Sequence, residues 1–383
     1  MWPVRYSKAT PKLHEHMVIV LAMLTAGADN ADTNEPLFLK QVSPHWPEFE
    51  KAMQQEYGSL IKSNMWELVP TPNQAVLTGR WVFKIKKDRM DNILKFKVRW
   101  VAHGYKQKEG LDFTNTFASV SKPMSWKAMI GVSAKRGYKI WQMDVVTAYL
   151  FGFLDEKVNI YQPTLMDDST GRVCMLKKAL YGLKQSACIW YQTLQDFLKK
   201  LCFKRVEANH GFFVSNNKSI FIAVYVDDIL FFGAPNNKQI QDAIQDLQDQ
   251  FQMTDLGEVS HYLGMEIDNN VEKKIVTLLQ STYLKKIVSH YGFEGCRPAK
   301  VPMSPGVPNS LDPNTSQATK DTITWYQSAV GALMWPVMHS RPDSTQSVAV
   351  LAQLCSNSSN IHIALVKQVL RYISGIIDKG LVF

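Results

Sequence analysis

Cysteines are few in this sequence, and none stands in a pattern that binds metal or builds a disulfide framework. The chain of 383 residues has five, with no CxxC pair and no Cys/His cluster. This spacing argues against a structural zinc site and against a secreted scaffold held by disulfides, and it favours a reducing compartment. The five are Cys174, Cys188, Cys202, Cys296 and Cys355.

Long apolar runs are missing as well. The one candidate, Met17–Ala28, is too short to span a bilayer. Because it follows Arg5, Lys8 and Lys12 and ends in an A-x-A-like sequence, it resembles a signal peptide. The unpaired cysteines and a strongly basic segment downstream argue against secretion, and we expect residues 1–36 to be a poorly ordered leader. The sequence also has no internal repeat and no heptad array, which excludes a repeat solenoid and a long coiled coil.

Positive charge is what the sequence does have, and it is concentrated in one segment. The chain carries a formal net charge of +9 and has a pI near 9.1. Arg80–Lys108 contains ten Lys or Arg against two Asp, a net charge of +8. Within it, apolar and basic residues alternate on both sides of Asp88–Asn92, which predicts a hairpin with one cationic face. Such a face suits a polyanion, and a solvated basic surface is the alternative.

Helical spacing of apolar residues predicts several amphipathic helices. One begins near Ser43-Pro44 and continues to Ile61, a second covers 240–251, and a third covers 284–291 and ends at Gly292. Residues 301–318 are rich in Pro, Ser and Asn and predict a linker or long loop, with helices after it that include 366–375.

Two adjacent carboxylates interrupt an apolar run at "YVDD", residues 225–228. The pattern predicts a hairpin with strands at Ser219–Tyr225 and Ile229–Gly233. Paired carboxylates repel each other, and a divalent cation is the usual remedy; a polar turn that happens to use Asp is the alternative. A further carboxylate, Asp144, lies in Tyr138–Leu154, which starts as a strand and continues as a helix-like stretch. If the two strands are neighbours in one sheet, the carboxylates can share two magnesium ions.

Eight collinear blocks of sequence carry a resemblance to a known family. The chain resembles the reverse transcriptase domain of copia-type (pseudoviral) long-terminal-repeat retrotransposons over about residues 37–383. The blocks are "WELVP", "GRWVFKIKKD", "FKVRWVAHGYKQKEGLDFTNTFASV", "QMDVVTAYLFGFLDE", "ALYGLKQ", "YVDDIL", "MTDLGEVSHYLGMEI" and "YQSAVGALMW…SRPD".

The resemblance implies an α+β fold of the right-hand polymerase type, with fingers, palm and thumb and an antiparallel palm sheet that carries the catalytic carboxylates. No RNase H domain is expected within this chain, although the family normally runs on into one. The implied divisions are a leader at 1–36, fingers at 37–137, a first palm segment at 138–155, an insertion between fingers and palm at 156–200, a second palm segment with the YVDD hairpin at 201–268, a thumb and linker at 269–318, and a helical connection-like region at 319–383.

The resemblance also implies the site. It implies that Asp144, Asp227 and Asp228 are the catalytic residues. They would bind two Mg²⁺ ions, with Mn²⁺ as a possible substitute. Contacts to the deoxynucleoside triphosphate fall to Lys86, Arg99, Tyr149 and Lys184, with the Tyr149 ring excluding a 2′-hydroxyl and Lys184 near the templating base. Nucleic-acid contacts fall to Lys84, Lys95, Lys97 and, where the primer end is held, Gly257.

Some of these residues have a structural alternative. Lys86 and Arg99 can belong to a solvated basic face, Tyr149 can be a core aromatic, and Lys184 can lie on the surface. The chain also departs from the family pattern at Phe151, at His103 and at residues 186–189, where polar or basic side chains are missing. "DSTG" (168–171) is similar to an aspartic-protease motif but is one residue too long, and we interpret it as a turn.

The sequence therefore predicts an RNA-directed DNA polymerase that extends a primer 3′-hydroxyl with deoxynucleotides, copying RNA or DNA. The alternative is a domesticated or decayed remnant that binds nucleic acid without turnover. Expected partners are a template with its primer, deoxynucleoside triphosphates, and a second copy or the RNase H and integrase domains of a polyprotein. No membrane partner is expected, and the expected location is a cytoplasmic virus-like particle or the nucleus.

Overall fold

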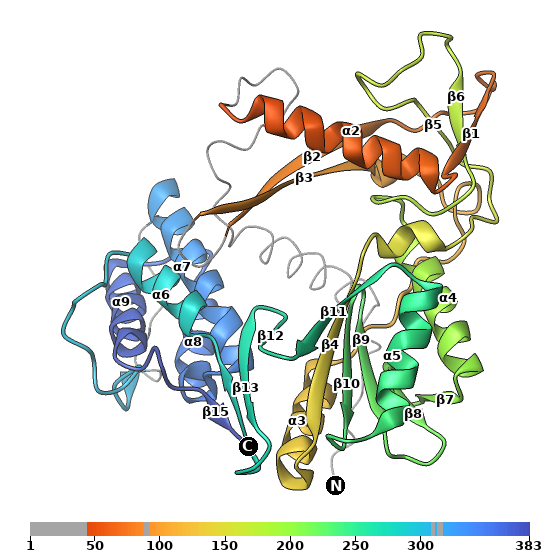
Figure 1. The fold of residues 1–383 in the computed structure, drawn as a ribbon. Helices are drawn as coiled ribbons and strands as arrows, with labels where there is room; N and C mark the ends of the chain where they lie inside the picture. Colours follow the sequence, from red (N-terminus) through yellow and green to blue (C-terminus); the bar gives the residue numbers. More distant parts are fainter. Residues whose placement is uncertain (1–43, 88–91, 308–310, 312–316) are drawn as a thin grey trace, which may run out of the picture. The chain divides into compact units, whose positions relative to one another are not determined.

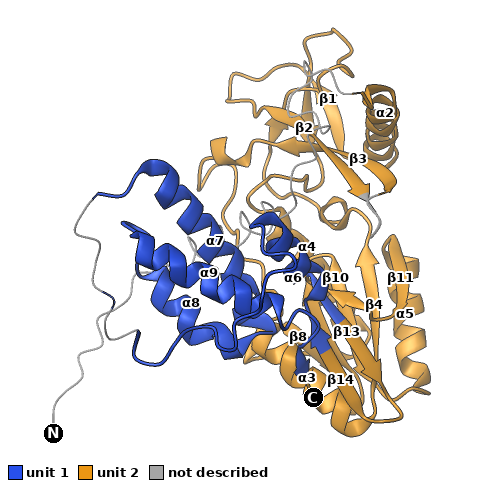
Figure 2. Ribbon diagram, turned by 90° about the vertical axis from the view of Figure 1, so that its left-hand side faces the viewer, with its two compact units in different colours: residues 1–32, 264–266, 278–381 blue, residues 33–263, 267–277, 382–383 orange. Residues whose placement is uncertain are grey.

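The computed structural model describes residues 44–87, 92–307, 311 and 317–383. In their described parts these form two compact units, one from 33–263, 267–277 and 382–383 and the other from 264–266 and 278–381 (Figure 2). The described residues combine helices with antiparallel sheets, which confirms the expected α+β class. The predicted leader lies outside the described residues, and no helix among the described ones is long and apolar enough to cross a bilayer.

The larger unit is built on a six-stranded sheet of order β11-β4-β10-β9-β8-β7. Every neighbouring pair in it is antiparallel. Strands β9 and β10 form the hairpin that the YVDD pattern predicts. The strands are β4 (Lys139–Val145), β7 (Phe203–Val206), β8 (Asn209–Ser215), β9 (Phe221–Tyr225), β10 (Asp228–Gly233) and β11 (Met253–Glu258).

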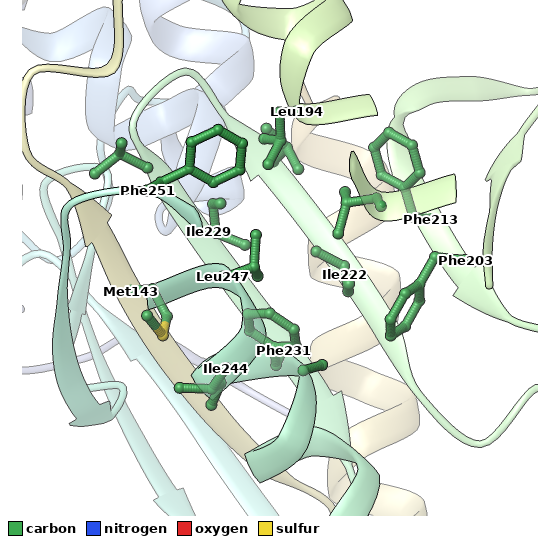
Figure 3. Close-up of a cluster of buried hydrophobic side chains, with 14 of the residues drawn as sticks. Met143, Leu194, Phe203, Phe213, Ile222, Ile229, Phe231, Ile244, Leu247 and Phe251 are labelled. Atoms are coloured by element: carbon green, nitrogen blue, oxygen red, sulfur yellow. The ribbon is translucent and has the colours of Figure 1, made fainter. Parts of the chain in front are cut away.

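One face of this sheet packs against helices α4 (Ser186–Lys200) and α5 (Lys238–Gln250), as Figure 1 shows. The predicted apolar stripe of α5 is buried there, and the Asn237 side chain caps the helix by accepting from Gln239 N–H. Figure 3 shows side chains of β4, β9, β10 and both helices meeting in one cluster. It includes Met143, Ile222, Ile229, Phe231, Leu194, Ile244 and Leu247.

The opposite face of the sheet carries helix α3 (Pro123–Arg136) in Figure 1. Proline at its first turn and the left-handed Gly137 after its last turn define its two ends. Because side chains alternate along a strand, Asp144 points away from the face on which its buried neighbours Met143 and Val145 pack. The Asp144 carboxylate is thus directed to the face of the sheet opposite α4 and α5.

The basic segment forms the predicted hairpin, β2 (Gly79–Lys87) and β3 (Ile93–Ala102). Its apolar face packs on helix α2 (Trp46–Lys62), the predicted N-terminal helix, which begins at Trp46. The Phe49 ring meets Phe83 and Phe96 edge-on, with ring centroids 5.3 and 5.0 Å apart. Figure 1 shows α2 running along the hairpin.

Short elements complete the larger unit. A three-stranded sheet has the order β1 (Trp66–Val69), β6 (Val173–Leu176), β5 (Asn159–Ile160), and η1 covers Gly104–Lys106. The helix-like stretch predicted after Asp144 is only one 3-10 turn, η2 (Ala148–Phe151). The backbone is extended again at Gly152, where a Cβ would collide with Ile189 on α4, so close packing against α4 ends the helical turn.

The smaller unit is mainly helical. Its helices are α6 (Ser281–His290), α7 (Lys320–His339), α8 (Thr345–Ala352) and α9 (Asn360–Ser374), with η4 at Pro342–Ser344. They confirm the helices predicted over 284–291 and 366–375, and they share one apolar cluster. A further sheet has the strand order β12 (His261–Tyr262), β13 (Met265–Asn270), β14 (Ile275–Leu279), β15 (Leu381–Val382).

Candidate active site

The three predicted carboxylates come together at one end of the six-stranded sheet. Asp228 on β10 is the register partner of Asp144 on β4. Asp227 belongs to the tight turn between β9 and β10, which closes with Tyr225 opposite Asp228. The Asp227 carbonyl accepts a hydrogen bond of 2.9 Å from Val145 N–H, so the turn is tied to the end of β4.

The YVDD turn and the turn that follows β4 each contain a β-branched residue in the left-handed region. Val226 has φ +58° and Thr147 has φ +59°, a conformation that side chains of this kind rarely adopt. In the YVDD turn only the first central residue has positive φ, the position that a type II′ turn normally gives to glycine. The Trp190 indole donates to the Val226 carbonyl at 2.7 Å and holds this strained turn in place.

Burial and neighbouring negative charge raise the pKa of two of these carboxylates, Asp228 and Asp144. Burial, followed by the charge of Asp227 and then that of Asp144, raises the pKa of Asp228 to about 6, while a hydrogen bond from Gln142 acts in the opposite sense. Burial and the charge of Asp227 also raise the pKa of Asp144, which is opposed by Lys86, Lys97 and Arg99. The site therefore holds negative charge at a cost that a cation would offset.

Oxygen ligands of this kind suit a hard divalent cation. In the described part of the chain, the Asp144 and Asp227 carboxylates accept no hydrogen bond and join no salt bridge, so their oxygens are available to an ion. Across those same residues, however, no three His, Cys, Asp or Glu side chains already surround one point as a metal centre requires. The donor chemistry fits Mg²⁺, and the coordination geometry is not preformed.

The predicted cationic face of the hairpin is present. Trp81, Phe83 and Ile85 of β2 are buried, while the intervening residues point to the other side. On that side lysines lie directly opposite lysines across the two strands, an arrangement that destabilises a free hairpin. The opposed pairs are Lys84 with Lys97 and Lys86 with Lys95, and Arg99 follows on the same face opposite Val82.

Lys97 and Arg99 interact electrostatically with the Asp144 carboxylate. Burial, then Arg99 and Lys86, lowers the pKa of Lys97 to about 8, while Asp144 and Asp227 oppose this shift. The Arg99 guanidinium lies over the Tyr181 ring, 4.3 Å from its centroid, and the Tyr149 ring meets Tyr181 at 5.1 Å. Tyr149 also packs at the edge of the sheet core. Its contact with the sugar stays a prediction.

Sequence reasoning missed two residues here, Tyr181 and Glu56. Tyr181 is the first residue of the "YGLK" block, from which the family resemblance implies a role only for Lys184. Glu56 lies on α2 with a buried, unpartnered Oε1; burial raises its pKa, while Arg99 and Lys97 oppose that shift. The available signal was its spacing, because Glu56 follows the buried Met53 by three positions and precedes the buried Leu60 by four.

Two other predicted contacts have defined surroundings. The Lys184 ammonium donates to the Gln107 carbonyl at 3.3 Å and lies 4.6 Å from the Phe113 ring centroid. Gly257 lies at a β-bulge in β11, the strand that pairs with β4, and has φ +71° with open space where a side chain would stand. Thr254 of the same strand is the register partner of Asp144. The nucleotide role of Lys184 and the primer role of Gly257 stay predictions.

The departures from the family pattern are accommodated by packing. Phe151 contacts the rings of Trp190 and Phe251, with centroids 6.1 and 5.3 Å apart. His103 Nδ1 lies 2.6 Å from Thr78 Oγ1, and Cys188 is buried. At these positions the side chains pack within the protein or contact a neighbouring side chain, where the family pattern has polar or basic residues.

Comparison with known proteins gives consistent matches. The family model described as "Reverse transcriptase (RNA-dependent DNA polymerase)" matches residues 63–305. The chain is 32% identical over 357 residues to the retrovirus-related Pol polyprotein from transposon TNT 1-94 of Nicotiana tabacum, covering 90% of this chain and 27% of that protein. It is 32% identical over 342 residues to the one from transposon RE1 of Arabidopsis thaliana, with coverages of 87% and 23%. A transposon Ty5-1 protein of Saccharomyces cerevisiae is 34% identical over 235 residues, 60% of this chain and 75% of that protein.

The chain spans about a quarter of the length of the two plant polyproteins. The family match covers more than half of the chain and includes Asp144, Asp227 and Asp228 as well as the basic hairpin. This chain thus belongs to the reverse transcriptase (RNA-dependent DNA polymerase) family of nucleotidyltransferases, in the form carried by copia-type retrotransposons.

Proposed function

We propose that this chain extends a primer 3′-hydroxyl with deoxynucleotides, copying an RNA or DNA template. The observation that carries the proposal is the placement of Asp144 directly opposite Asp228, with Asp227 in the adjoining turn. The electrostatic coupling of Asp144 to Lys86, Lys97 and Arg99 supports it, because nucleotidyl transfer needs anionic metal ligands and cationic phosphate contacts together.

In this proposal Asp144, Asp227 and Asp228 would hold two Mg²⁺ ions, or Mn²⁺ in their place. When bound, such ions would help to activate the attacking hydroxyl and would neutralise charge on the triphosphate. The chain's own contribution is to hold the carboxylates in position, and the Trp190 bond to the Val226 carbonyl supports the turn that does so. Gln142, donating to Asp228 Oδ1 at 3.2 Å, orients that carboxylate.

Substrate contacts follow from the same arrangement. Lys86 and Arg99 would bind the triphosphate, and Tyr149 would lie under the sugar. Lys184 would approach the templating base, and the bulge at Gly257 would hold the primer end beside Asp144. The opposed lysines Lys84, Lys86, Lys95 and Lys97 support a polyanion on this face, since bound phosphates relieve their repulsion.

The finer architecture is part of the proposal. We assign a right-hand polymerase with fingers at 37–137, palm at 138–155 and 201–268 around the insertion 156–200, thumb and linker at 269–318, and a connection-like region at 319–383. Because two of the relatives named above are Pol polyproteins, RNase H and integrase domains are the expected partners, with a second copy of the chain as another. The proposed location is a virus-like particle or the nucleus.

Primer extension tests this function. The purified chain should extend a labelled primer on RNA and DNA templates only when Mg²⁺ or Mn²⁺ is present. Asp227→Asn should reduce extension on the order of 10³-fold or more and leave primer–template affinity within a few-fold, because the carboxylate acts on metal during chemistry. Asp242→Asn, an exposed carboxylate on α5, is the matched control and should extend like wild type. Tight binding without extension by wild type would favour the remnant hypothesis instead.

A further inference from the structure

Tyr181 lies between two residues that the proposed function assigns to the incoming nucleotide. On one side the Arg99 guanidinium stacks over its ring, 4.3 Å from the centroid. On the other side the Tyr149 ring meets it at 5.1 Å with an interplanar angle of 67°. Arg99 comes from β3 and Tyr149 from η2, so a single aromatic side chain joins the basic hairpin to the segment beside Asp144.

The backbone around Tyr181 is fixed against the hairpin. Ala102 N–H, at the end of β3, donates to the Tyr181 carbonyl at 2.8 Å. The next residue, Gly182, has φ +91°, and a Cβ there would collide with the Ala102 carbonyl. A Cβ on Gly104 would in turn collide with the Gly182 carbonyl, so two glycines let the segments cross in direct backbone contact.

A buried amide network fixes the other end of the segment. The Gln107 side chain accepts from Lys184 N–H at 2.8 Å and donates to Gln185 Oε1 at 3.0 Å. The Gln185 amide donates in turn to the Asp112 carbonyl at 2.7 Å. Tyr181 therefore stands on a backbone held from both sides, which limits how far its ring can move.

We propose that Tyr181 is a positioning residue that holds Arg99 and Tyr149 in one arrangement and so couples the phosphate contact to the sugar contact. The inference rests on the proposed function. An arginine side chain loses considerable rotamer freedom when it binds phosphate, and a ring already stacked on it reduces that loss. A ring that also supports Tyr149 keeps the surface under the sugar from receding when a ribonucleotide enters.

The structure gives two linked expectations for a variant without this ring. Tyr181→Leu should raise the KM for a deoxynucleotide about 5- to 30-fold, with a smaller change in kcat, because the missing stacking acts on substrate placement. It should also lower the preference for deoxynucleotide over ribonucleotide by a similar factor. Tyr181→Phe, which keeps the ring, should stay within about two-fold of wild type in both measurements.

Steady-state kinetics with dCTP and CTP on one primer–template, beside a thermal melt, provide the test. Phe212→Leu is the matched control, because it removes a buried aromatic ring, stacked on Phe232 in the same sheet, away from the nucleotide. It should lower stability without changing the dCTP-to-CTP ratio. Arg99→Lys, which keeps the charge and loses the planar stacking, is the second variant and should raise the KM even if Tyr181→Leu folds poorly.

The outcomes separate this inference from the proposed function. A wild-type chain that extends primers, beside Tyr181→Leu and Arg99→Lys variants with unchanged KM and unchanged sugar preference, overturns the role of Tyr181 alone. Equal losses for dCTP and CTP in Tyr181→Leu and Phe212→Leu also overturn it, since they indicate only weakened packing. A wild-type chain that neither extends a primer nor binds dCTP in a complex with a dideoxy-terminated primer overturns both.

Discussion

Asp144 and Asp228 lie directly opposite one another on the antiparallel strands β4 and β10, and Gln142 reaches from the first strand to the second carboxylate. Residues paired across two strands have side chains on the same face and within a few ångströms of each other. Two carboxylates in this relation repel each other, and Asp227 in the adjoining turn adds to the repulsion. A cation, or a neutral side chain in place of one carboxylate, should therefore relieve the repulsion.

Replacing Asp228 by Asn should stabilise the metal-free protein. The folded-state pKa of Asp228 is about 6, above its ordinary value of 3.8, so its contribution to stability falls as pH rises from about 4 to 7. At pH 7.5 without divalent cations we expect Asp228→Asn to raise the melting temperature by roughly 2–5 °C. Added Mg²⁺ should raise the melting temperature of wild type, by mass action, and that of the variant much less.

Differential scanning calorimetry of wild type, Asp228→Asn and the control Asp242→Asn, each with EDTA and with Mg²⁺, measures both effects. A variant that is less stable than wild type in EDTA would contradict the repulsion. An equal Mg²⁺ shift in wild type and variant would remove Asp228 from the metal ligands.

Removing one lysine from each opposed pair should have opposite effects on stability and binding. In Lys84→Gln/Lys95→Gln each remaining lysine, Lys97 and Lys86, no longer faces a like charge, so the free protein should become slightly more stable. Duplex binding should weaken, and the slope of log affinity against log salt should become shallower by about 0.9 for each phosphate that the protein no longer neutralises.

Fluorescence anisotropy with a labelled duplex, from about 50 to 200 mM salt, gives the slope for this pair of substitutions. Lys200→Gln/Lys204→Gln, which removes two exposed lysines at and beyond the end of α4, is the control with the same change in net charge. Identical slopes for the two double variants would mean that net charge, and not the hairpin face, governs binding.

Lys97 should make stability rise with pH in the alkaline range. Its folded-state pKa is about 8, while a lysine in the unfolded chain titrates near 10.4, so the unfolded state binds more protons between these values. The folded state disfavours the charged form of Lys97, which lowers the free energy of unfolding. This destabilisation is present in full below pH 8 and disappears as pH rises toward about 10.4. Urea denaturation at pH 7, 8.5 and 9.5 should show that the free energy of unfolding of wild type increases relative to that of Lys97→Met as pH rises. Lys97→Arg, which stays charged, should show no such gain, and parallel curves for all three proteins would refute the shift.

Shrinking Tyr149 separates its predicted sugar contact from a role in packing. If its ring lies under the deoxyribose, Tyr149→Val should raise kcat/KM for CTP more than it lowers kcat/KM for dCTP, because a 2′-hydroxyl no longer meets the ring. The change in ratio could reach the order of 10²-fold. If Tyr149 only packs against the core, kcat/KM should fall equally for both substrates. The melting temperature should also fall, since truncating a buried aromatic side chain lowers the free energy of unfolding by about 3–5 kcal/mol. A ratio that does not move, in a variant that folds and polymerises, would exclude the sugar contact.

The sequence by itself determined the local elements of this protein. Alternation of apolar with basic residues predicted the hairpin of β2 and β3, and two apolar runs around "YVDD" predicted that of β9 and β10. The spacing of apolar residues predicted α2 and α5 in nearly their observed bounds. These predictions succeed because the periodicity of a strand or helix is a property of residues close together in the sequence and does not depend on the rest of the chain.

The tertiary structure alone decided which distant segments meet. Periodicity does not reveal that β4 inserts between β10 and β11, and only that register sets Asp144 opposite Asp228. Nor does it reveal that Tyr181 stands between Arg99 and Tyr149, or that close packing at Gly152 limits the turn after Asp144 to η2. The reason is physical: strand register and ring contacts depend on how complete elements pack in three dimensions, and a residue's neighbours in sequence carry no record of that choice.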